Sequence, residues 1–246
     1  MEREEFSTHI SEQLNRNIEA LFNEVARMGG LVESQLTNLR QALETGNIDL
    51  AKEALATDEL INQEEMEIDR LSAAVLARQQ PTASDLRLIV MAIRVAVDLE
   101  RMGDEAVKIA KLAIHQCEEE VGCTRLPCYN ELCTLMQSGE KMIQKTLNGF
   151  SRLDISDVLW VYQEEERMDM VLADALVTVR SKLASETDLS QIDVLTDMFM
   201  SIRAAERVTD HALNVAESVV YLVKGIDIRK MGEEEIAKLI EDDKNS

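Results

Sequence analysis

The chain of 246 residues has few of the residues that β-rich folds need: aromatics make up 3%, and there are only 9 glycines and 2 prolines. Turn-rich sandwiches and barrels depend on all three, so an all-β fold is disfavoured. Hydrophobic residues make up 46%, which is enough to bury a core and excludes a disordered chain. Strong helix formers dominate instead, and the composition indicates an all-α protein.

Positive charge is also scarce, with 26 Lys and Arg against 47 Asp and Glu and a net charge of −21. Such a charge repels phosphate backbones and anionic lipids, which disfavours nucleic acid and membrane surfaces as partners. The start MEREEFSTHI lacks the basic and apolar regions of an export signal, and no apolar run approaches the roughly 18–20 residues that span a bilayer. We therefore expect a cytoplasmic protein without direct membrane insertion, in which the four cysteines stay reduced.

Long helical patterns follow one another with few breaks. Gly46 ends the first pattern and Pro81 ends the second, because each residue type disfavours continued helix at its place. The spacing of apolar residues predicts six helices, over about 8–44, 49–78, 82–116, 129–150, 156–185 and 189–224.

The two halves of the chain repeat one another. Glu100-Arg-x-x-Asp104 matches Glu206-Arg-x-x-Asp210 at an offset of 106 residues, and the segment after Asp58 matches the segment after Glu165 at an offset of 107. Consecutive matches at nearly the same offset indicate a duplicated unit. We predict two tandem pseudo-symmetric three-helix bundles with up-down topology: a first repeat over 1–122, a second over 123–230, and an acidic C-terminal tail over 231–246.

Small and apolar residues in alternating steps of three and four predict the buried face of the third and sixth helices. These positions are Ile89, Ala92, Ala96, Leu99, Gly103, Ala106, Ala110 and Ala113, and Leu195, Met198, Ile202, Ala205, Thr209, Ala212, Ala216 and Val219. Helical packing alone explains this stripe, so it is interpreted as core rather than as a cofactor site.

Carboxylates form pairs four residues apart on four helices, which places each pair on one helix face. The pairs are Glu65 with Asp69, Glu100 with Asp104, Glu165 with Asp169, and Glu206 with Asp210. Two interpretations compete. Either arginines such as Arg101 and Arg207 pair these acids, or neighbouring pairs converge into one oxygen-rich cluster per repeat. Clustered carboxylates repel one another unless a hard cation neutralises them, so the second interpretation predicts metal ligands.

Recognisable catalytic motifs are lacking. A di-iron bundle needs Glu-x-x-His pairs, but the residues three before the histidines are Phe6, Leu112 and Val208. There is no glycine-rich phosphate loop and no G-x-S-x-G, so no catalytic residue and no organic cofactor is predicted. The spacing of Cys117, Cys123, Cys128 and Cys133 contains no C-x₂-C pair, which disfavours a structural zinc site and leaves their role open.

Four motifs resemble the PhoU family of phosphate-specific transport accessory proteins. They are Met28-Gly-Gly-Leu-Val-Glu33, Gln80-Pro81-Thr-Ala-Ser-Asp-Leu-Arg87, the duplicated Glu-Arg-x-x-Asp, and Tyr221-Leu-Val-Lys-Gly225. The resemblance extends over about residues 7–229, and the duplicated motif is its most specific part.

The resemblance implies a cytoplasmic, commonly dimeric regulator that restrains the phosphate ABC transporter and represses the phosphate-starvation response. Its partners would be the transporter's ATPase subunit and a sensor histidine kinase. It also implies that the four carboxylate pairs hold iron or another metal such as zinc, magnesium or manganese. One departure is Asn62, which stands where the second repeat has Asp169, so we expect the first cluster to be weaker or shifted toward Asp58 and Glu65.

Two other functions stay open from the sequence. The same carboxylates suit a metal-binding, storage or redox protein, which would oxidise Fe²⁺ faster than buffer does. A purely structural bundle would keep its metal content and signalling when Glu100, Asp104, Glu206 and Asp210 are neutralised.

Overall fold

The computed structural model describes residues 12–79, 81, 83–117 and 123–244, and every regular element in these ranges is a helix. The helices are α1 (Glu12–Thr45), α2 (Ile48–Gln79), α3 (Ala83–Gln116), α4 (Tyr129–Arg152), α5 (Val158–Ser185), α6 (Leu189–Lys224) and α7 (Glu233–Lys244). The predicted all-α class is confirmed, and the predicted bounds of the sixth helix coincide with those of α6. The predicted start near residue 8 and the repeat boundary at residue 122 lie outside the described residues.

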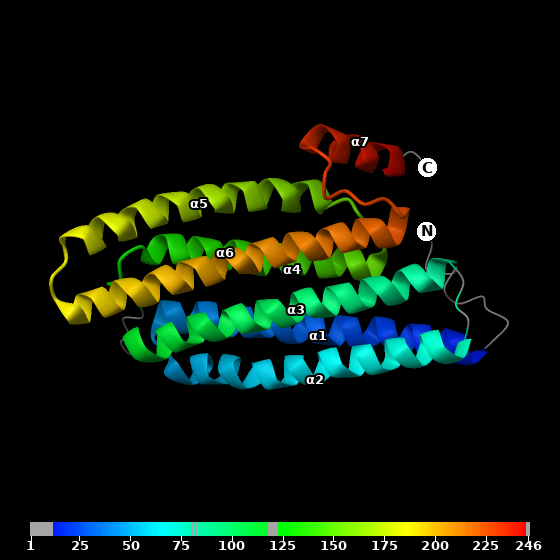
Figure 1. Ribbon diagram of the computed structural model, residues 1–246, viewed down its shortest axis with the longest axis horizontal. Helices are drawn as coiled ribbons and strands as arrows, with labels where there is room; N and C mark the ends of the chain where they lie inside the picture. Colours follow the sequence, from blue (N-terminus) through cyan, green and yellow to red (C-terminus); the bar gives the residue numbers. More distant parts are fainter. Residues whose placement is uncertain (1–11, 80, 82, 118–122, 245–246) are drawn as a thin grey trace.

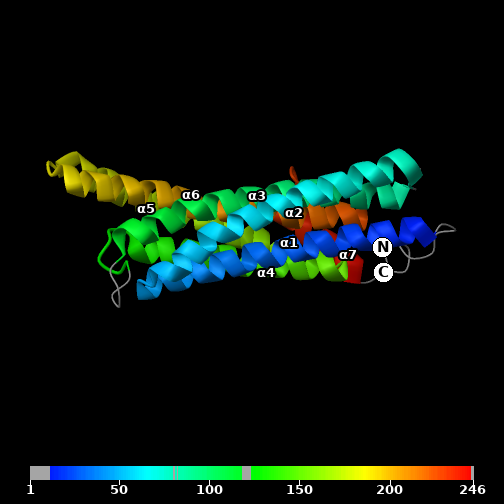
Figure 2. The ribbon, with the colours of Figure 1, turned by 90° about the horizontal axis from the view of Figure 1, so that it is seen from below.

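Two antiparallel three-helix units lie side by side along their length (Figure 1). Helices α1, α2 and α3 form one unit, and α4, α5 and α6 form the other. Helix α3 packs along α6 and α1 packs against α4, so these two contacts join the units. The loop end of the α5–α6 pair extends beyond the first unit, as both ribbon views show (Figures 1 and 2). None of the described helices is both long and apolar enough to cross a membrane.

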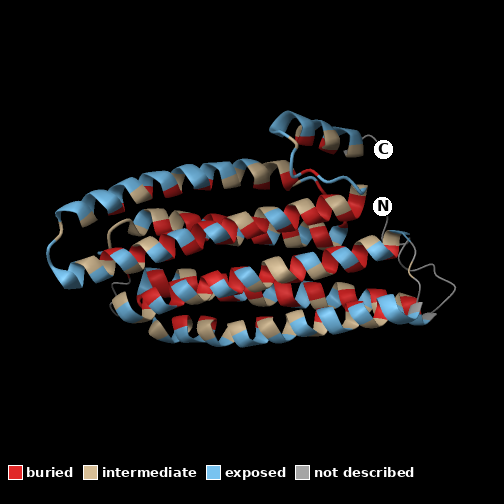
Figure 3. Ribbon diagram, viewed as in Figure 1, coloured by how far each residue is buried: buried red, intermediate tan, exposed pale blue. Residues whose placement is uncertain are grey.

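The core follows the stripes predicted for α3 and α6, and all sixteen of those positions are buried (Figure 3). Small residues dominate the stripe of α3, and they let its backbone approach the neighbouring helices. This packing holds α2 against α3 and α5 against α6, which is the arrangement that brings the acidic faces together.

The segment predicted as an acidic tail contains a helix, α7, that packs against α5 (Figure 1). Ile236 and Ile240 stand four residues apart on its inner face and are only 1% and 6% exposed. Residues at this spacing share one helix face, so burying them offsets the cost of ordering the segment. The acidic tail therefore carries a packed helix, because its abundant acids are interrupted by this short apolar pattern.

The prediction that all four cysteines stay reduced was wrong for Cys117 and Cys123, which form a disulfide; Cys128 and Cys133 are free. The two Cα atoms lie 4.5 Å apart, which is within the range that a disulfide spans. The backbone N–H of Cys123 donates to the carbonyl of Leu43 at 2.9 Å, so the end of α1 positions this half of the bridge.

Candidate metal centre

Carboxylates of α5 and α6 converge in the second repeat. Glu165 and Asp169 lie on α5 and Asp210 lies on α6, and one ligand oxygen from each is within 4.8 Å of the other two. The i, i+4 spacing on α5 aligns its two carboxylates, and the packing of α6 against α5 adds the third. The structure therefore brings together acids from two different helices, up to 45 residues apart in the sequence, as the repeat pattern predicts.

Glu206 lies near this group, one turn earlier on α6, and interacts electrostatically with its members. The residue is only 6% exposed, and its Oε2 is buried without a hydrogen-bond partner. Nη1 of Arg203 lies 3.3 Å from this oxygen, but their orientation makes an ion pair without a hydrogen bond. A buried carboxylate oxygen without a hydrogen bond is costly, and a bound cation would offset that cost.

The electrostatics of the second cluster show this cost. Burial raises the pKa of Glu165 to about 7, with Asp169 and Asp210 adding to the effect. Burial also raises the pKa of Glu206 to about 7, with a further contribution from Asp210. The pKa of Asp210 is raised by burial and then by Asp169. Like charges held together in a partly desolvated site favour protonation, and a bound cation would reverse that preference.

The first repeat contains a second group of acids, on α2 and α3. Burial raises the pKa of Glu100, and Asp104, Glu65 and Asp58 each add to the shift. Burial raises the pKa of Asp58 as well, followed by the charge of Asp104. The pKa of Glu65 is raised by burial, then by Asp69 and Asp104. Four acids therefore act on one another here, namely Asp58, Glu65, Glu100 and Asp104.

The two clusters are not built from equivalent residues. By the repeat offset, Asp58 corresponds to Glu165 and Asn62 to Asp169, whereas the counterpart of Glu65 is Leu172. Asn62 has no carboxylate where the second repeat has Asp169. Glu65, about one turn further along α2, supplies a carboxylate to the first cluster instead. Asp69 is exposed, and of the other predicted ligands it influences only Glu65, so it lies at the edge of the cluster.

Gly103 gives Asp58 its place in the first cluster. A Cβ atom at position 103 would lie 3.1 Å from Oδ1 of Asp58, which is tighter than almost all real contacts of this kind. The equivalent position of the second repeat holds Thr209. The same Oδ1 is buried without a hydrogen bond, so the first cluster also contains one unsatisfied carboxylate oxygen.

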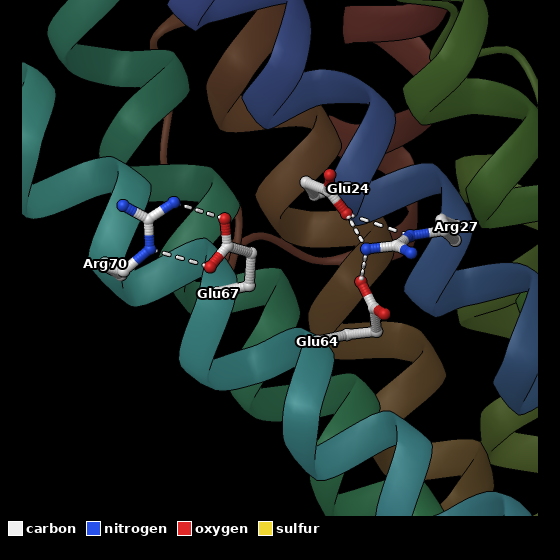
Figure 4. Close-up of polar contacts among 5 residues, drawn as sticks. All are labelled: Glu24, Arg27, Glu64, Glu67 and Arg70. Carbon is white, nitrogen blue, oxygen red and sulfur yellow. Dashed lines mark hydrogen bonds and ion pairs between the residues drawn. The ribbon is translucent and has the colours of Figure 1, made fainter.

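Arginines pair acids elsewhere on the surface. The guanidinium of Arg27 lies between Glu24 of α1 and Glu64 of α2, and Arg70 donates to Glu67 at 2.5 and 2.8 Å (Figure 4). Arg207 pairs with Glu105 at 3.4 Å rather than with its neighbour Glu206. Among the described residues, Arg203 makes the one ion pair to any of the predicted ligands, so guanidinium groups neutralise the clusters only in part.

The donor sets fit a hard cation. Each cluster offers carboxylate oxygens from two helices, which suits Mg²⁺, Mn²⁺, Ca²⁺ or iron, and neither includes a Cys or His ligand that would favour a soft metal. The unsatisfied oxygens of Asp58 and Glu206 face groups that are already acidic, so a cation relieves both the repulsion and the missing contacts.

Comparisons with known proteins agree with the duplicated architecture. The family model of the PhoU domain matches residues 25–113 and 132–219, once in each unit. A phosphate-specific transport system accessory protein PhoU homolog of Pseudomonas aeruginosa is 37% identical over 230 residues, which covers 94% of this chain and 93% of that protein. The accessory protein PhoU of Escherichia coli K12 is 33% identical over 232 residues and 94% of both chains.

Two solved structures are similar over most of the chain. The crystal structure of PhoU from Pseudomonas aeruginosa has a TM-score of 0.78 at 36% identity and covers 86% of this chain and 99% of its own. The phosphate transport system regulatory protein PhoU from Streptococcus pneumoniae has a TM-score of 0.74 at 25% identity, with 85% and 96% covered.

Proposed function

Because the chain belongs to the PhoU family, we propose that it is a regulatory accessory protein of phosphate-specific transport. In this role it restrains the phosphate ABC transporter when phosphate is abundant and represses the phosphate-starvation response through a sensor histidine kinase. The observation that carries the proposal is the match of both repeats to the family domain, together with relatives named as accessory and regulatory proteins over nearly their full length.

The carboxylate clusters supply the physical basis of the regulation. Asp58, Glu65, Glu100 and Asp104 would hold one metal site, and Glu165, Asp169, Glu206 and Asp210 would hold the other. When bound, a divalent or trivalent cation such as iron supplies positive charge in the middle of an acidic surface. The acids of each cluster then change from a repulsive patch to a neutral or positive one, which an anionic face of a partner protein can approach.

Location and partners follow from the proposed role. The protein acts in the cytoplasm, where the ATPase subunit of the transporter and the kinase present their soluble parts, and it works as a homodimer. Two stiff helical units with one cluster each offer two docking faces on one molecule. The first cluster lies on α2 and α3 and the second on α5 and α6, so each unit carries its own, which supports an adaptor that bridges two partners.

A reporter of phosphate starvation tests the proposed function. Deleting the gene is expected to raise reporter expression in rich phosphate, and the wild-type gene is expected to restore repression. A variant with Glu100→Gln, Asp104→Asn, Glu206→Gln and Asp210→Asn should fail to restore it. The matched control neutralises four exposed acids, Glu19, Glu53, Asp174 and Asp193, and should repress normally.

Repression that persists after deletion would contradict the regulatory role. A redox or storage function predicts a different outcome, in which the purified protein oxidises Fe²⁺ faster than buffer while the reporter stays repressed in the deletion strain.

Asn62→Asp is expected to strengthen the first metal site. The substitution gives α2 the carboxylate that α5 has at Asp169, and an added charged oxygen ligand should tighten Mn²⁺ binding about tenfold, or roughly 1.4 kcal/mol. Calorimetric titration in an Asp169→Asn, Asp210→Asn background isolates this site. Asn23→Asp, on the exposed side of α1, is the control. Unchanged Mn²⁺ affinity in the Asn62→Asp variant would show that position 62 does not face the ion.

A further inference from the structure

An open cavity of about 320 Å³ lies between α3 and α6, where the two repeats meet. It is separate from the carboxylate clusters: Arg94 and Arg101 line it from α3, about a quarter of a turn around that helix from Glu100 and Asp104. The segment after α6 closes one end with Asp227 and Arg229.

Two of the three acids that line the cavity already have partners. Oδ1 of Asp98 lies 3.0 Å from Nδ1 of His211 and accepts a hydrogen bond from Asn214 at 3.1 Å. Both carboxylate oxygens of Asp227 accept from Arg229, with Nε 2.9 Å from Oδ1. Arg229 therefore neutralises Asp227, and the contacts with His211 and Asn214 hold the carboxylate of Asp98 in place.

Arg94 and Arg101 are left available. Neither makes an ion pair or hydrogen bond to the described residues, and both are exposed to the cavity mouth. They stand seven residues apart, so they lie on one face of α3 about 10.5 Å apart along its axis, within reach of a common ligand. One guanidinium fork satisfies a carboxylate, whereas a phosphate group has the oxygens and the charge to engage two.

Part of the remaining wall is apolar and aromatic. Ile93 and Val97 face it from α3, and Tyr221 faces it from α6, each partly buried. The volume lies at the lower end of the range for small-molecule sites and exceeds what a lone oxyanion needs. We propose that this cavity binds a small phosphate monoester, with the phosphate on Arg94 and Arg101 and an apolar or aromatic part against Ile93, Val97 and Tyr221.

Glu217 tunes the affinity of the site. Its half-buried carboxyl lines the same cavity, and no described residue gives it a hydrogen bond. Burial raises the pKa of Glu217 to about 7, and the nearby Arg229 partly opposes the shift. The ionised carboxylate repels an incoming anion in the same cavity, so removing its charge strengthens anion binding.

Calorimetric titration of the full chain in EDTA tests the site with adenosine monophosphate, adenosine and inorganic phosphate. Adenosine monophosphate is expected to bind at least about tenfold more tightly than either of the other two. Arg94→Gln or Arg101→Gln should weaken it about tenfold or more, and Glu217→Gln should strengthen it. Arg180→Gln, at an exposed position of α5, should leave it unchanged.

The opposite signs expected at Arg94 and Glu217 separate a lost contact from a damaged fold. No detectable binding of adenosine monophosphate at millimolar concentration overturns the proposal, as do arginine variants that bind it like the wild type. If adenosine binds as tightly as adenosine monophosphate, the arginines do not hold the phosphate. If inorganic phosphate binds as tightly, the apolar wall does not contribute to binding. Either result also overturns the proposal. The reporter experiment on the carboxylate variants is independent of all these outcomes.

Discussion

In protein stripped of metal by a chelator, the midpoint of thermal unfolding should fall by roughly 5 °C or more between pH 5.5 and pH 8. Glu165 and Glu206 have folded-state pKa values of about 7, above the ordinary 4.5 of an unfolded glutamate. Between these values the folded state holds protons that the unfolded state has released. Stability is therefore lost as the pH rises through this window, because ionisation charges a cluster that lacks its cation.

Neutralising part of the second cluster should reverse this behaviour. The double variant Asp169→Asn, Asp210→Asn removes two charges that raise the pKa of Glu165. In chelator at pH 8 it is expected to melt a few degrees above the wild type, with a shallower pH dependence. Mn²⁺ at a hundredfold excess over its Kd for the second site should stabilise the wild type by about 2.7 kcal/mol through that site, or roughly 5–10 °C, and the variant, which keeps only the first site, by less.

Scanning calorimetry with and without Mn²⁺ measures both effects. Asp174→Asn, Asp193→Asn changes the same residue type on the same two helices at exposed positions, and should behave like the wild type. If the Asp169→Asn, Asp210→Asn variant instead melts below the wild type in chelator, the carboxylates are stabilising partners within the fold and not an uncompensated cluster.

Gly149→Ala should destabilise the protein by about 1–3 kcal/mol, one of the largest effects of adding a single methyl group to this chain. A Cβ atom at position 149 would lie 2.7 Å from the backbone carbonyl oxygen of Asp154, which cannot rotate away as a side chain can. The carbonyl of Gly149 also accepts the backbone N–H of Asp154 at 2.9 Å. This close approach shapes the turn from α4 into α5, the helix that carries Glu165 and Asp169.

Gly30→Ala is the matched control for this prediction. Gly30 is in the interior of α1, and no atom outside its own helix lies within 4 Å of a Cβ built there. Alanine at such a site should stabilise the helix by about 0.5–1 kcal/mol. Urea unfolding gives both free energies. Equal changes in the two variants would mean that the turn after α4 tolerates a Cβ and does not set the start of α5.

The sequence predicts the helices and their buried faces well, because 3.6-residue periodicity and a fixed repeat offset are local signals. It predicts the second cluster for the same reason: Glu165, Asp169, Glu206 and Asp210 lie at equal spacing on helices that pack together. Asp69 shows the limit of the approach. Its i, i+4 spacing from Glu65 matches that of the other pairs, but the repeat offset aligns it with Leu176 and not with an acid.

Contacts between segments could not be read in this way. The disulfide depends on how close Cys117 and Cys123 lie in the fold, which their spacing in the sequence does not specify. The cavity depends on α3 and α6 packing at the repeat junction. The sequence does contain one signal for the cavity, since Arg87, Arg94 and Arg101 recur every seven residues and form a basic stripe in an acidic chain. Only the packing shows that Arg94 and Arg101 line a cavity.

Elemental analysis of protein purified without chelator tests the metal clusters most directly. The wild type should retain iron or another hard metal. The variant with Glu100→Gln, Asp104→Asn, Glu206→Gln and Asp210→Asn should lose it while keeping its helical circular dichroism. Equal metal content in the two proteins, or none in either after dialysis against Mn²⁺ or Fe²⁺, would contradict the assignment of these carboxylates as ligands.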